Sequence, residues 1–424
     1  SLIYLFFFYS VHISENGGRF VSTEKRNENF MLKQSRYSKG KKNVKQYSKN
    51  NASKKSGSGK NSYNAYYKKN DDGFQPKSNG KSNYSKKKYP SKSKGYPKKN
   101  AQKPSIKIAF LGGLNEIGKN ITLVECENDI IIIDCGMAFP DGDMLGVDLV
   151  IPDFTYIEQN ADRVKGIILT HGHEDHIGGL PFLLSKVNVP IYGTPLTLGL
   201  VGNKLKEHSL YNQSQLNVIN AGQSIKLGCM KIDFIHVNHS IPDAVAFAIH
   251  TPGGTIVHTG DFKIDCTPIT GDMIDLSSFA RVGDEGVLAL LSESTNAERP
   301  GYTPTERTVS DSLDNLFKSA ENYRIIIATF ASNVNRVQQI IDCAEKYGRK
   351  VAFSGRSMVN YMDVAQKLGY LHLPENILID IDMLDKYMPQ QVVLVTTGSQ
   401  GEPMSALSRM AYSDHRKAVS YTHL

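Results

Sequence analysis

The sequence predicts an α/β protein whose first folded part is an αββα sandwich and whose last part is the start of a second α/β domain. Three observations lead to this prediction. Short apolar runs rich in β-branched residues recur between residues 106 and 257, separated by glycine-containing turns. Stretches of helical character lie between several of these runs. A turn crowded with histidine and carboxylate follows one run, which predicts a metal site at the loop edge of the sheets.

The apolar runs define the strands of the sandwich in chain order. We expect strands at 106–111, 121–126 and 130–134, then short strands around Ile168, Ile191, Phe234, Phe247 and Val257. Helices are expected near 177–186 and 195–208. Two sheets packed face to face, with helices outside them, account for this alternation.

A second α/β region follows. The segment 303–306 reads Thr-Pro-Thr-Glu, the pattern of a capping box with proline at the first helical position. It predicts a helix that begins there and runs to about Ser319. Apolar runs then alternate with helical stretches, and such continuous runs predict a parallel sheet buried on both faces. The runs lie at 325–327, 351–353 and 392–395, and the helices around 333–347 and 357–368. We therefore divide the folded chain into domains at 105–303 and 304–417.

A strongly basic arm precedes these domains. Residues 32–104 hold 22 Lys or Arg against two Asp, a net charge of +20. Residues 1–31 are neutral and the whole chain carries +8, so the remainder carries −12. The arm, 31–104, is rich in Ser, Asn, Gly and Tyr and is expected to be disordered. Lysine can neutralise phosphates and tyrosine can stack on bases, which favours RNA binding. A solubilising tail or a contact with anionic lipid is the alternative.

Both ends of the chain are interpreted as foreign to the fold. Met31 is the first methionine, and residues 1–30 are expected to be translated upstream sequence. Their apolar opening, 1–9, is too short to span a bilayer, although a membrane anchor is the alternative. Residues 418–424 are expected to be a read-through tail.

The histidine-rich turn carries the chemistry. Residues 171–176 read His-Gly-His-Glu-Asp-His, and imidazole and carboxylate are the ligand types of zinc and similar ions. This spacing cannot send all four ligands to one tetrahedral ion. It assigns His171 and His173 to one ion and Asp175 and His176 to a second. Two such ions can clamp a phosphate or acyl oxygen. The alternative is a histidine cluster on a solvated turn.

The His-x-His-x-Asp-His pattern resembles the signature of the metallo-β-lactamase fold. Three further residues follow in the family's order, namely Asp134 after an apolar strand, His239, and Asp261 in a Thr-Gly-Asp turn. In that family the third histidine completes the first metal site and the late aspartate bridges both ions. The aspartate on the early strand forms hydrogen bonds to the metal environment without ligating.

Five longer sequence blocks indicate a particular branch of this superfamily. They lie at 111–120, 291–298, 328–333, 355–358 and 397–404. Together they are similar to ribonuclease J, the bacterial RNA-processing branch of the β-CASP nucleases, over roughly residues 105–417. The resemblance implies a metallo-β-lactamase sandwich with an inserted β-CASP domain. It also implies a two-metal ribonuclease with 5′-to-3′ exonuclease and endonuclease action in mRNA decay and rRNA maturation.

The resemblance assigns roles to particular residues. Asp175 is expected to orient the attacking water, Asp134 to support the ligands, and Glu293 to orient the family's acid histidine. The Gly-flanked turns that contain Arg356, Ser357, Ser399 and Gln400 are expected to seat the RNA 5′ end, although ordinary turns are the alternative. The expected cofactor is two Zn²⁺, with Mn²⁺ or Mg²⁺ as alternatives.

The resemblance also implies the partners and the location. The partner is single-stranded RNA with a 5′-monophosphate. A homo-oligomer or paralogue complex in the cytoplasm, with ribosome or degradosome association, is the family expectation, and no membrane is expected. Five dispersed cysteines without C-x-x-C pairing suit a reducing compartment.

The family pattern is incomplete in this sequence. The family's returning segment carries a His-x-Ser-Gly-His block and a final histidine ligand, and neither occurs here. We therefore expect an inactive fragment whose second metal site lacks one ligand.

Two other functions stay open, a lactonase or thioesterase on the same fold and a non-catalytic RNA-binding subunit. Asp141 and Asp143 could hold Ca²⁺, although a plain turn is favoured. The remaining histidines are expected to be structural, namely His208, His236, His250, His258 and His372.

Overall fold

The computed structural model describes residues 10–12, 103–140, 143–399, 405–412 and 414–415. The chain divides into two compact units, and all of these residues belong to the one formed by 1–24 and 102–424. The predictions for residues 1–9, 13–30 and the arm up to 102 lie outside the described residues, as do those for Asp141, Gln400 and the 418–424 tail.

The first sheet has seven strands in the order β1-β2-β3-β4-β5-β6-β7. Pairing is antiparallel from β1 to β4 and parallel from β4 to β7. The strands are β1 (Ser10–His12), β2 (Ile106–Gly112), β3 (Ile121–Cys126), β4 (Asp129–Ile133), β5 (Val164–Ile168), β6 (Ile191–Gly193) and β7 (Leu216–Val218). The central strands β3 and β4 are buried on both faces, which explains their nearly continuous apolar sequences.

The second sheet has five strands in the order β12-β11-β10-β9-β8. Pairing is antiparallel except between β11 and β12, which are parallel. The strands are β8 (Ser224–Leu227), β9 (Met230–His236), β10 (Val245–Thr251), β11 (Gly254–His258) and β12 (Ala289–Leu291). Phe234 and Phe247 pack edge to face between the sheets, with ring centroids 5.1 Å apart, against Ile131 and Ile133 of β4.

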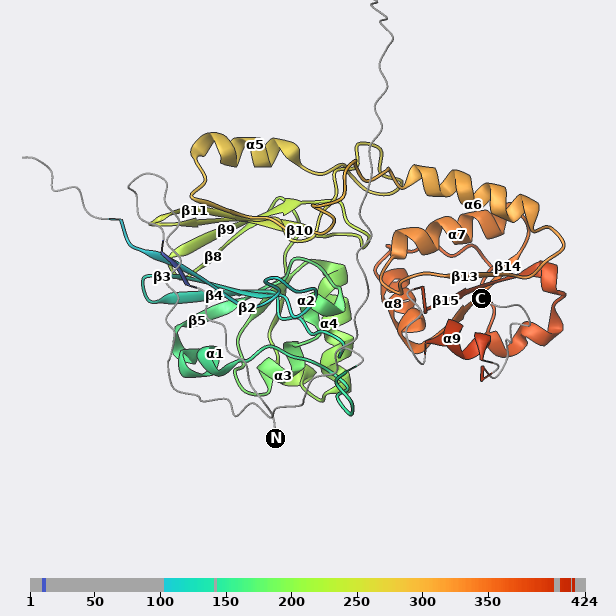
Figure 1. The fold of residues 1–424 in the computed structure, drawn as a ribbon, viewed down its shortest axis with the longest axis horizontal. Coiled ribbons are helices and arrows are strands. Elements are labelled where there is room, and N and C mark those ends of the chain that lie inside the picture. The colour runs from blue at the N-terminus through green and yellow to red at the C-terminus, as the bar shows by residue number, and fades with distance from the viewer. Residues whose placement is uncertain (1–9, 13–102, 141–142, 400–404, 413, 416–424) are drawn as a thin grey trace, which may run out of the picture. The chain divides into compact units, whose positions relative to one another are not determined.

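Helices cover the outer faces of both sheets (Figure 1). Those beside the first sheet are α1 (Thr155–Gln159), α2 (Glu174–Ile177), α3 (Leu180–Leu184) and α4 (Pro195–Glu207), with 3₁₀ turns at Ala161–Arg163 and Tyr211–Gln213. Helix α5 (Leu276–Glu285) covers the second sheet, where Val282 packs against Ala246 and Ala248 of β10. The predicted αββα sandwich is therefore confirmed.

The helix predicted near 177–186 is present as the shorter α3, and a separate turn of helix, α2, precedes it. Gly178 and Gly179 lie between α2 and α3, where the chain passes the segment that follows β4. A Cβ on Gly178 would lie 2.3 Å from Met137 Cγ, and one on Gly179 would lie 2.6 Å from Gly136 O. The glycines permit this close approach, and both keep right-handed helical dihedrals.

The second α/β region contains a parallel sheet in the order β13-β15-β14, as predicted. Its strands are β13 (Ile325–Ala328), β14 (Lys350–Ser354) and β15 (Val392–Thr396). Its helices are α6 (Arg307–Ser319), α7 (Val334–Lys346), α8 (Arg356–Lys367) and α9 (Ala406–Ala411), with 3₁₀ turns at Ile381–Lys386 and Pro389–Gln391. Val393 and Val395 face the core that contains α7 and α8, whereas Val392 and Leu394 face Met410 of α9.

The predicted capping box at the start of α6 is wrong, although the helix does end at Ser319. The helix begins at Arg307, and the residue before it, Glu306, forms no side-chain cap. Instead, the Glu306 carboxylate pairs with Lys263 at 2.9 Å and with Arg336 at 2.8 Å. Because the Glu306 carboxylate pairs with these two side chains, it does not form the capping-box hydrogen bond.

Among the described residues, no helix has the length and apolar character needed to cross a bilayer.

Candidate metal centre

The candidate ligands come from loops that follow neighbouring strands. Strands β4 and β5 are parallel, with Ile133 opposite Ile168, so both chains leave the first sheet at the same edge. Asp134 follows β4 and the 171–176 turn follows β5. His239 follows β9 and Asp261 follows β11 of the second sheet. The centre therefore lies where the edges of the two sheets meet.

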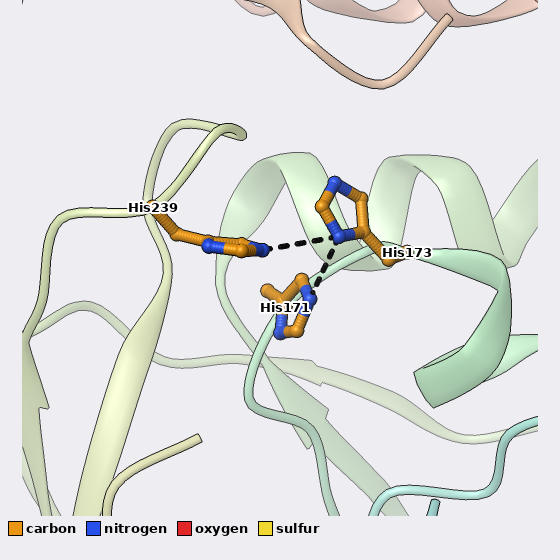
Figure 2. A group of neighbouring side chains, drawn as sticks. All are labelled: His171, His173 and His239. Carbon is orange, nitrogen blue, oxygen red and sulfur yellow. Dashed lines mark hydrogen bonds between the residues drawn. The ribbon is translucent and has the colours of Figure 1, made fainter. Parts of the chain in front are cut away.

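Three histidines form the first group of candidate ligands. His171 Nε2 lies 3.0 Å from His173 Nδ1, and His239 Nε2 lies 3.2 Å from the same atom. Figure 2 shows the three rings pointing toward one another. One nitrogen from each lies within 4.8 Å of the other two. The structure thus brings His239 to the two earlier histidines, 66 residues from His173 along the chain.

A second group lies beside the first and shares His171 with it. His171, His176 and Asp261 each place a ligand atom within 4.8 Å of the other two. His176 Nε2 is 3.5 Å from Asp261 Oδ1 and 3.5 Å from Asp175 Oδ2. The other Asp261 oxygen, Oδ2, is 3.8 Å from His239 Nε2. Asp261 therefore directs one oxygen to each group.

Asp134 and Thr170 fix the proton positions on two of the histidines. Asp134 is buried, and its Oδ2 accepts hydrogen bonds from Thr170 Oγ1 and His176 Nδ1, both at 2.8 Å. Because Thr170 donates its hydroxyl proton to Asp134, Thr170 Oγ1 accepts the hydrogen bond from His171 Nδ1 at 3.0 Å. Protons on both Nδ1 atoms leave both Nε2 lone pairs facing the centre.

Burial sets the charge of the cluster. Burial and the neighbouring imidazoles lower the pKa of His171 and of His173 well below 6.5. Burial also lowers the pKa of His239, to about 4. Burial raises the pKa of Asp175, while His176 lowers the pKa of Asp261 against the effect of burial. Against the effect of burial, Asp134, Asp261 and Asp175 raise the pKa of His176 well above 6.5, so a cation must displace the Nε2 proton of that ring. The neutral imidazoles of His171, His173 and His239 and the carboxylate of Asp261 are donors that a divalent cation needs, so the residues fit such an ion.

Two further residues, to which the sequence analysis assigned no role, contact the candidate ligands. Asn120 Nδ2 lies 3.1 Å from His176 Nε2 and 3.3 Å from Asp175 Oδ2. Thr170 makes the contacts described above. Thr170 could have been found from its position, one residue before His171 at the end of a strand beside Asp134. Asn120 ends the 111–120 block that carries the family resemblance, but that block assigned no role to its amide.

Glu293 forms local contacts. Its side chain is half-buried and accepts a hydrogen bond from Thr295 N at 2.6 Å, while its own N–H donates to Thr259 Oγ1 at 3.2 Å. Among the described residues, neither group of candidate ligands includes it.

The predicted RNA-binding residues lie at the carboxyl edge of the parallel sheet. Arg356 and Ser357 begin α8, and Ser399 follows β15. The two turns approach each other, since a Cβ on Gly355 would lie 3.0 Å from Thr397 Oγ1. All three side chains are exposed. Arg356 lines an open cavity of about 550 Å³ together with Ser354, Asn360, Arg409 and His415.

The calcium prediction gains no support. Asp143 is exposed, and no group of three potential ligands within the described part of the chain includes it.

The five histidines expected to be structural contact protein groups. His208 packs on Phe182, His236 contacts Asp272 O, His250 pairs with Asp233, His258 accepts from Gly260 N, and His372 N donates to Gln338. The described cysteines are all free thiols.

Comparison with known proteins agrees with this geometry. The sequence model of the metallo-beta-lactamase superfamily matches residues 114–300, and that of the ribonuclease J beta-CASP domain matches residues 322–421. The chain is thus a metallo-β-lactamase protein that carries a β-CASP domain.

Curated relatives show which family of these proteins the chain resembles. Ribonuclease J of Helicobacter pylori strain J99 is 49% identical over 315 residues, 74% of this chain and 45% of the relative. Ribonuclease J2 of Bacillus subtilis strain 168 is 45% identical over 320 residues, 76% of this chain and 57% of the relative. The chain belongs to the ribonuclease J family and spans about half the length of the curated relatives it matches.

A solved structure shares the fold. The crystal structure of a protein of unknown function from Enterococcus faecalis V583 superimposes with a TM-score of 0.53 at 17% sequence identity. The match covers 70% of this chain and 78% of that one.

Proposed function

We propose that this chain carries the catalytic centre of a metal-dependent ribonuclease that hydrolyses RNA phosphodiester bonds, as an exonuclease from the 5′ end and as an endonuclease. The observation that carries the proposal is the convergence of His171, His173 and His239 beside His176 and Asp261. The family's β-CASP domain and the ribonuclease names of the relatives support RNA as the substrate.

Two divalent ions fit the donor set. His171, His173 and His239 would hold one ion, and this all-nitrogen group suits zinc. Asp175, His176 and Asp261 would hold the second, and their oxygen content also suits Mn²⁺ or Mg²⁺. When bound, a pair of ions supplies Lewis acidity to the scissile phosphate and lowers the pKa of water.

The protein residues provide orientation and charge balance. Asp134 holds His176, and Thr170 holds His171, so both rings keep one orientation. Asp175 and Asp261 offset the charge of the cations and can accept hydrogen bonds from the attacking water. Glu293 would orient a proton donor near the leaving group, as its family position implies.

The carboxyl edge of the parallel sheet formed by β13, β15 and β14 would seat the RNA. Arg356, Ser357 and Ser399 are exposed, and Arg356 opens α8 at its positively polarised end. With Gln400 they would bind the 5′-monophosphate through charge-assisted and hydroxyl hydrogen bonds. The basic arm would add affinity through phosphate contacts that do not depend on sequence.

A cleavage assay on the complete gene product tests the substrate class. With Zn²⁺ or Mn²⁺, we expect faster degradation of 5′-monophosphorylated than of 5′-triphosphorylated single-stranded RNA, and no hydrolysis of nitrocefin or a thioester. His171→Ala should lower RNA cleavage about a thousandfold or more, because several kcal/mol of transition-state stabilisation depend on the ion. Hydrolysis of the small substrates without RNA cleavage would contradict the proposal.

A further inference from the structure

Two tyrosines from the β-CASP part of the chain reach the loops that carry the candidate ligands. Tyr361, on α8, donates its hydroxyl to Gly172 O at 3.0 Å. Tyr370, three residues beyond the end of α8, donates to Asp243 Oδ2 at 2.8 Å. These contacts join residues 189 and 127 positions apart in the sequence.

The first contact fixes the peptide between two candidate ligands. Gly172 lies between His171 and His173 in the chain. A Cβ on Gly172 would lie 2.6 Å from Leu200 Cδ1 of α4, so this segment already packs against that helix. Burial and the nearby carboxylates of Glu174 and Asp175 raise the pKa of Tyr361 well above 10. The phenol therefore stays protonated and acts as a donor to the carbonyl.

The second contact holds the loop that carries His239. Asp243 lies four residues after His239 and has a φ of 56°, a conformation that needs support in a non-glycine residue. Its Oδ2 accepts a hydrogen bond from Leu196 N at 2.8 Å as well as the one from Tyr370. The loop is thereby tied both to the start of α4 and to the β-CASP part.

Close packing of α8 on α4 makes these contacts geometrically fixed. Gly199 of α4 faces α8, and a Cβ there would lie 2.8 Å from Val364 Cγ1 and 3.0 Å from Leu368 Cδ1. The absence of a side chain on Gly199 therefore sets the separation between the helices. A helix held this close cannot shift without moving the Tyr361 hydroxyl relative to Gly172 O.

We propose that Tyr361 and Tyr370 are positioning residues through which the β-CASP part holds two of the three ligand-bearing loops of the metal centre, the loop of residues 171–176 and the loop that carries His239. This inference rests on the proposed metal centre and goes beyond it, because neither tyrosine is a ligand. Helix α8 begins at Arg356 and carries Tyr361. One helix therefore starts at the edge proposed to seat RNA and contacts the loop of residues 171–176.

Cobalt binding to the chain measures this role without any cleavage assay. Co²⁺ is titrated in competition with a chelator, and the visible absorption of the saturated protein is recorded. Tyr361→Phe should weaken Co²⁺ binding about tenfold and change the absorption band, as loss of a supporting contact does elsewhere. Tyr370→Phe should weaken it about threefold, because Asp243 keeps its bond from Leu196 N.

Tyr347→Phe is the matched control. Its hydroxyl bonds Asp314 Oδ1 at 3.2 Å within the same region, and in the described part of the chain its hydrogen-bond partners lie outside the metal loops. We expect wild-type Co²⁺ affinity and spectrum for this variant. Equal losses in Tyr361→Phe and Tyr347→Phe, or no loss in Tyr361→Phe, would overturn the inference.

His171→Ala tests the metal centre separately from the positioning role of the tyrosines. If this variant binds Co²⁺ as tightly as the wild type, the proposed metal centre itself is wrong. If it loses binding while Tyr361→Phe behaves like Tyr347→Phe, the centre stands and only the positioning role fails.

Discussion

The two sheet edges that carry the candidate functional residues differ in how their polar groups are used. At the sandwich edge, Asp134, Thr170 and His176 bond one another in a buried network. At the edge of the parallel sheet, Arg356 and Ser357 are exposed and form no side-chain hydrogen bond to another described residue. A buried hydrogen-bond network of this kind suits an ion that stays bound. Exposed donors without partners among the described residues, such as those of Arg356 and Ser357, suit a ligand that binds and dissociates.

The largest effect should come from breaking the buried network. Asp134→Asn keeps the shape but places an amide where two protons are accepted, so His176 loses the partner that fixes its tautomer. We expect Zn²⁺ affinity to fall roughly 10- to 100-fold, measured by chelator competition. A variant with unchanged affinity would mean that the sandwich edge is no more preorganised than the other.

A buried carboxylate away from the metal centre, Glu125, should contribute to stability without affecting metal binding. Glu125 on β3 is buried and bonds Lys107 at 2.8 Å, Arg163 at 2.7 Å and Tyr156 of α1 at 2.8 Å. Burial alone would raise its pKa, but these partners lower the pKa from 4.5 to about 2. Glu125→Gln should cost about 2 kcal/mol of unfolding free energy at pH 7.

The pH dependence of that loss follows from the sign of the shift. A lowered folded-state pKa stabilises the protein above about pH 4.5, and this contribution disappears as the pH falls toward 2. Urea unfolding of wild type and Glu125→Gln should therefore converge as the pH falls through this window, with Zn²⁺ affinity at pH 7 equal in both. A difference that grew in acid would refute the assignment.

A substitution at the exposed edge of the parallel sheet should have a smaller effect, limited to RNA binding. Arg356→Ala should raise the KM for 5′-monophosphorylated RNA about tenfold, because one charge-assisted hydrogen bond is lost, while kcat and Zn²⁺ affinity stay unchanged. Lys367→Ala is the control, since this exposed lysine on the same helix pairs with Asp363. Equal responses to the two substitutions would show that general charge matters and that the turn does not.

The smallest effect is expected from the basic arm. Removing residues 32–104 should weaken RNA binding and flatten the plot of log K against log salt by roughly 0.7 for each phosphate released. Cleavage at saturating RNA should stay nearly constant in the complete gene product. An unchanged slope, measured by fluorescence anisotropy, would assign the arm to another partner.

The sequence predicted the strands well because their signal is local. The isoleucine run at 130–133 must be buried wherever it lies, and it forms the centre of the first sheet. The misplaced start of α6 had a long-range cause, namely the ion pairs of Glu306. The spaced histidines could be recognised from 171–176. The contact of Asn120 with His176 and that of Tyr361 with Gly172 could not, because both are formed only when distant parts of the chain fold together.

The bond from Tyr361 to Gly172 also has a consequence for biosynthesis. The two residues lie 189 positions apart, and a ribosome adds about 5–20 residues per second. The histidine turn therefore leaves the ribosome roughly 10–40 s before the tyrosine that holds it. During that interval the nascent chain exposes its ligands without their final support. If Tyr361 has the proposed positioning role, full metal affinity is acquired late in synthesis, after α8 has docked on α4.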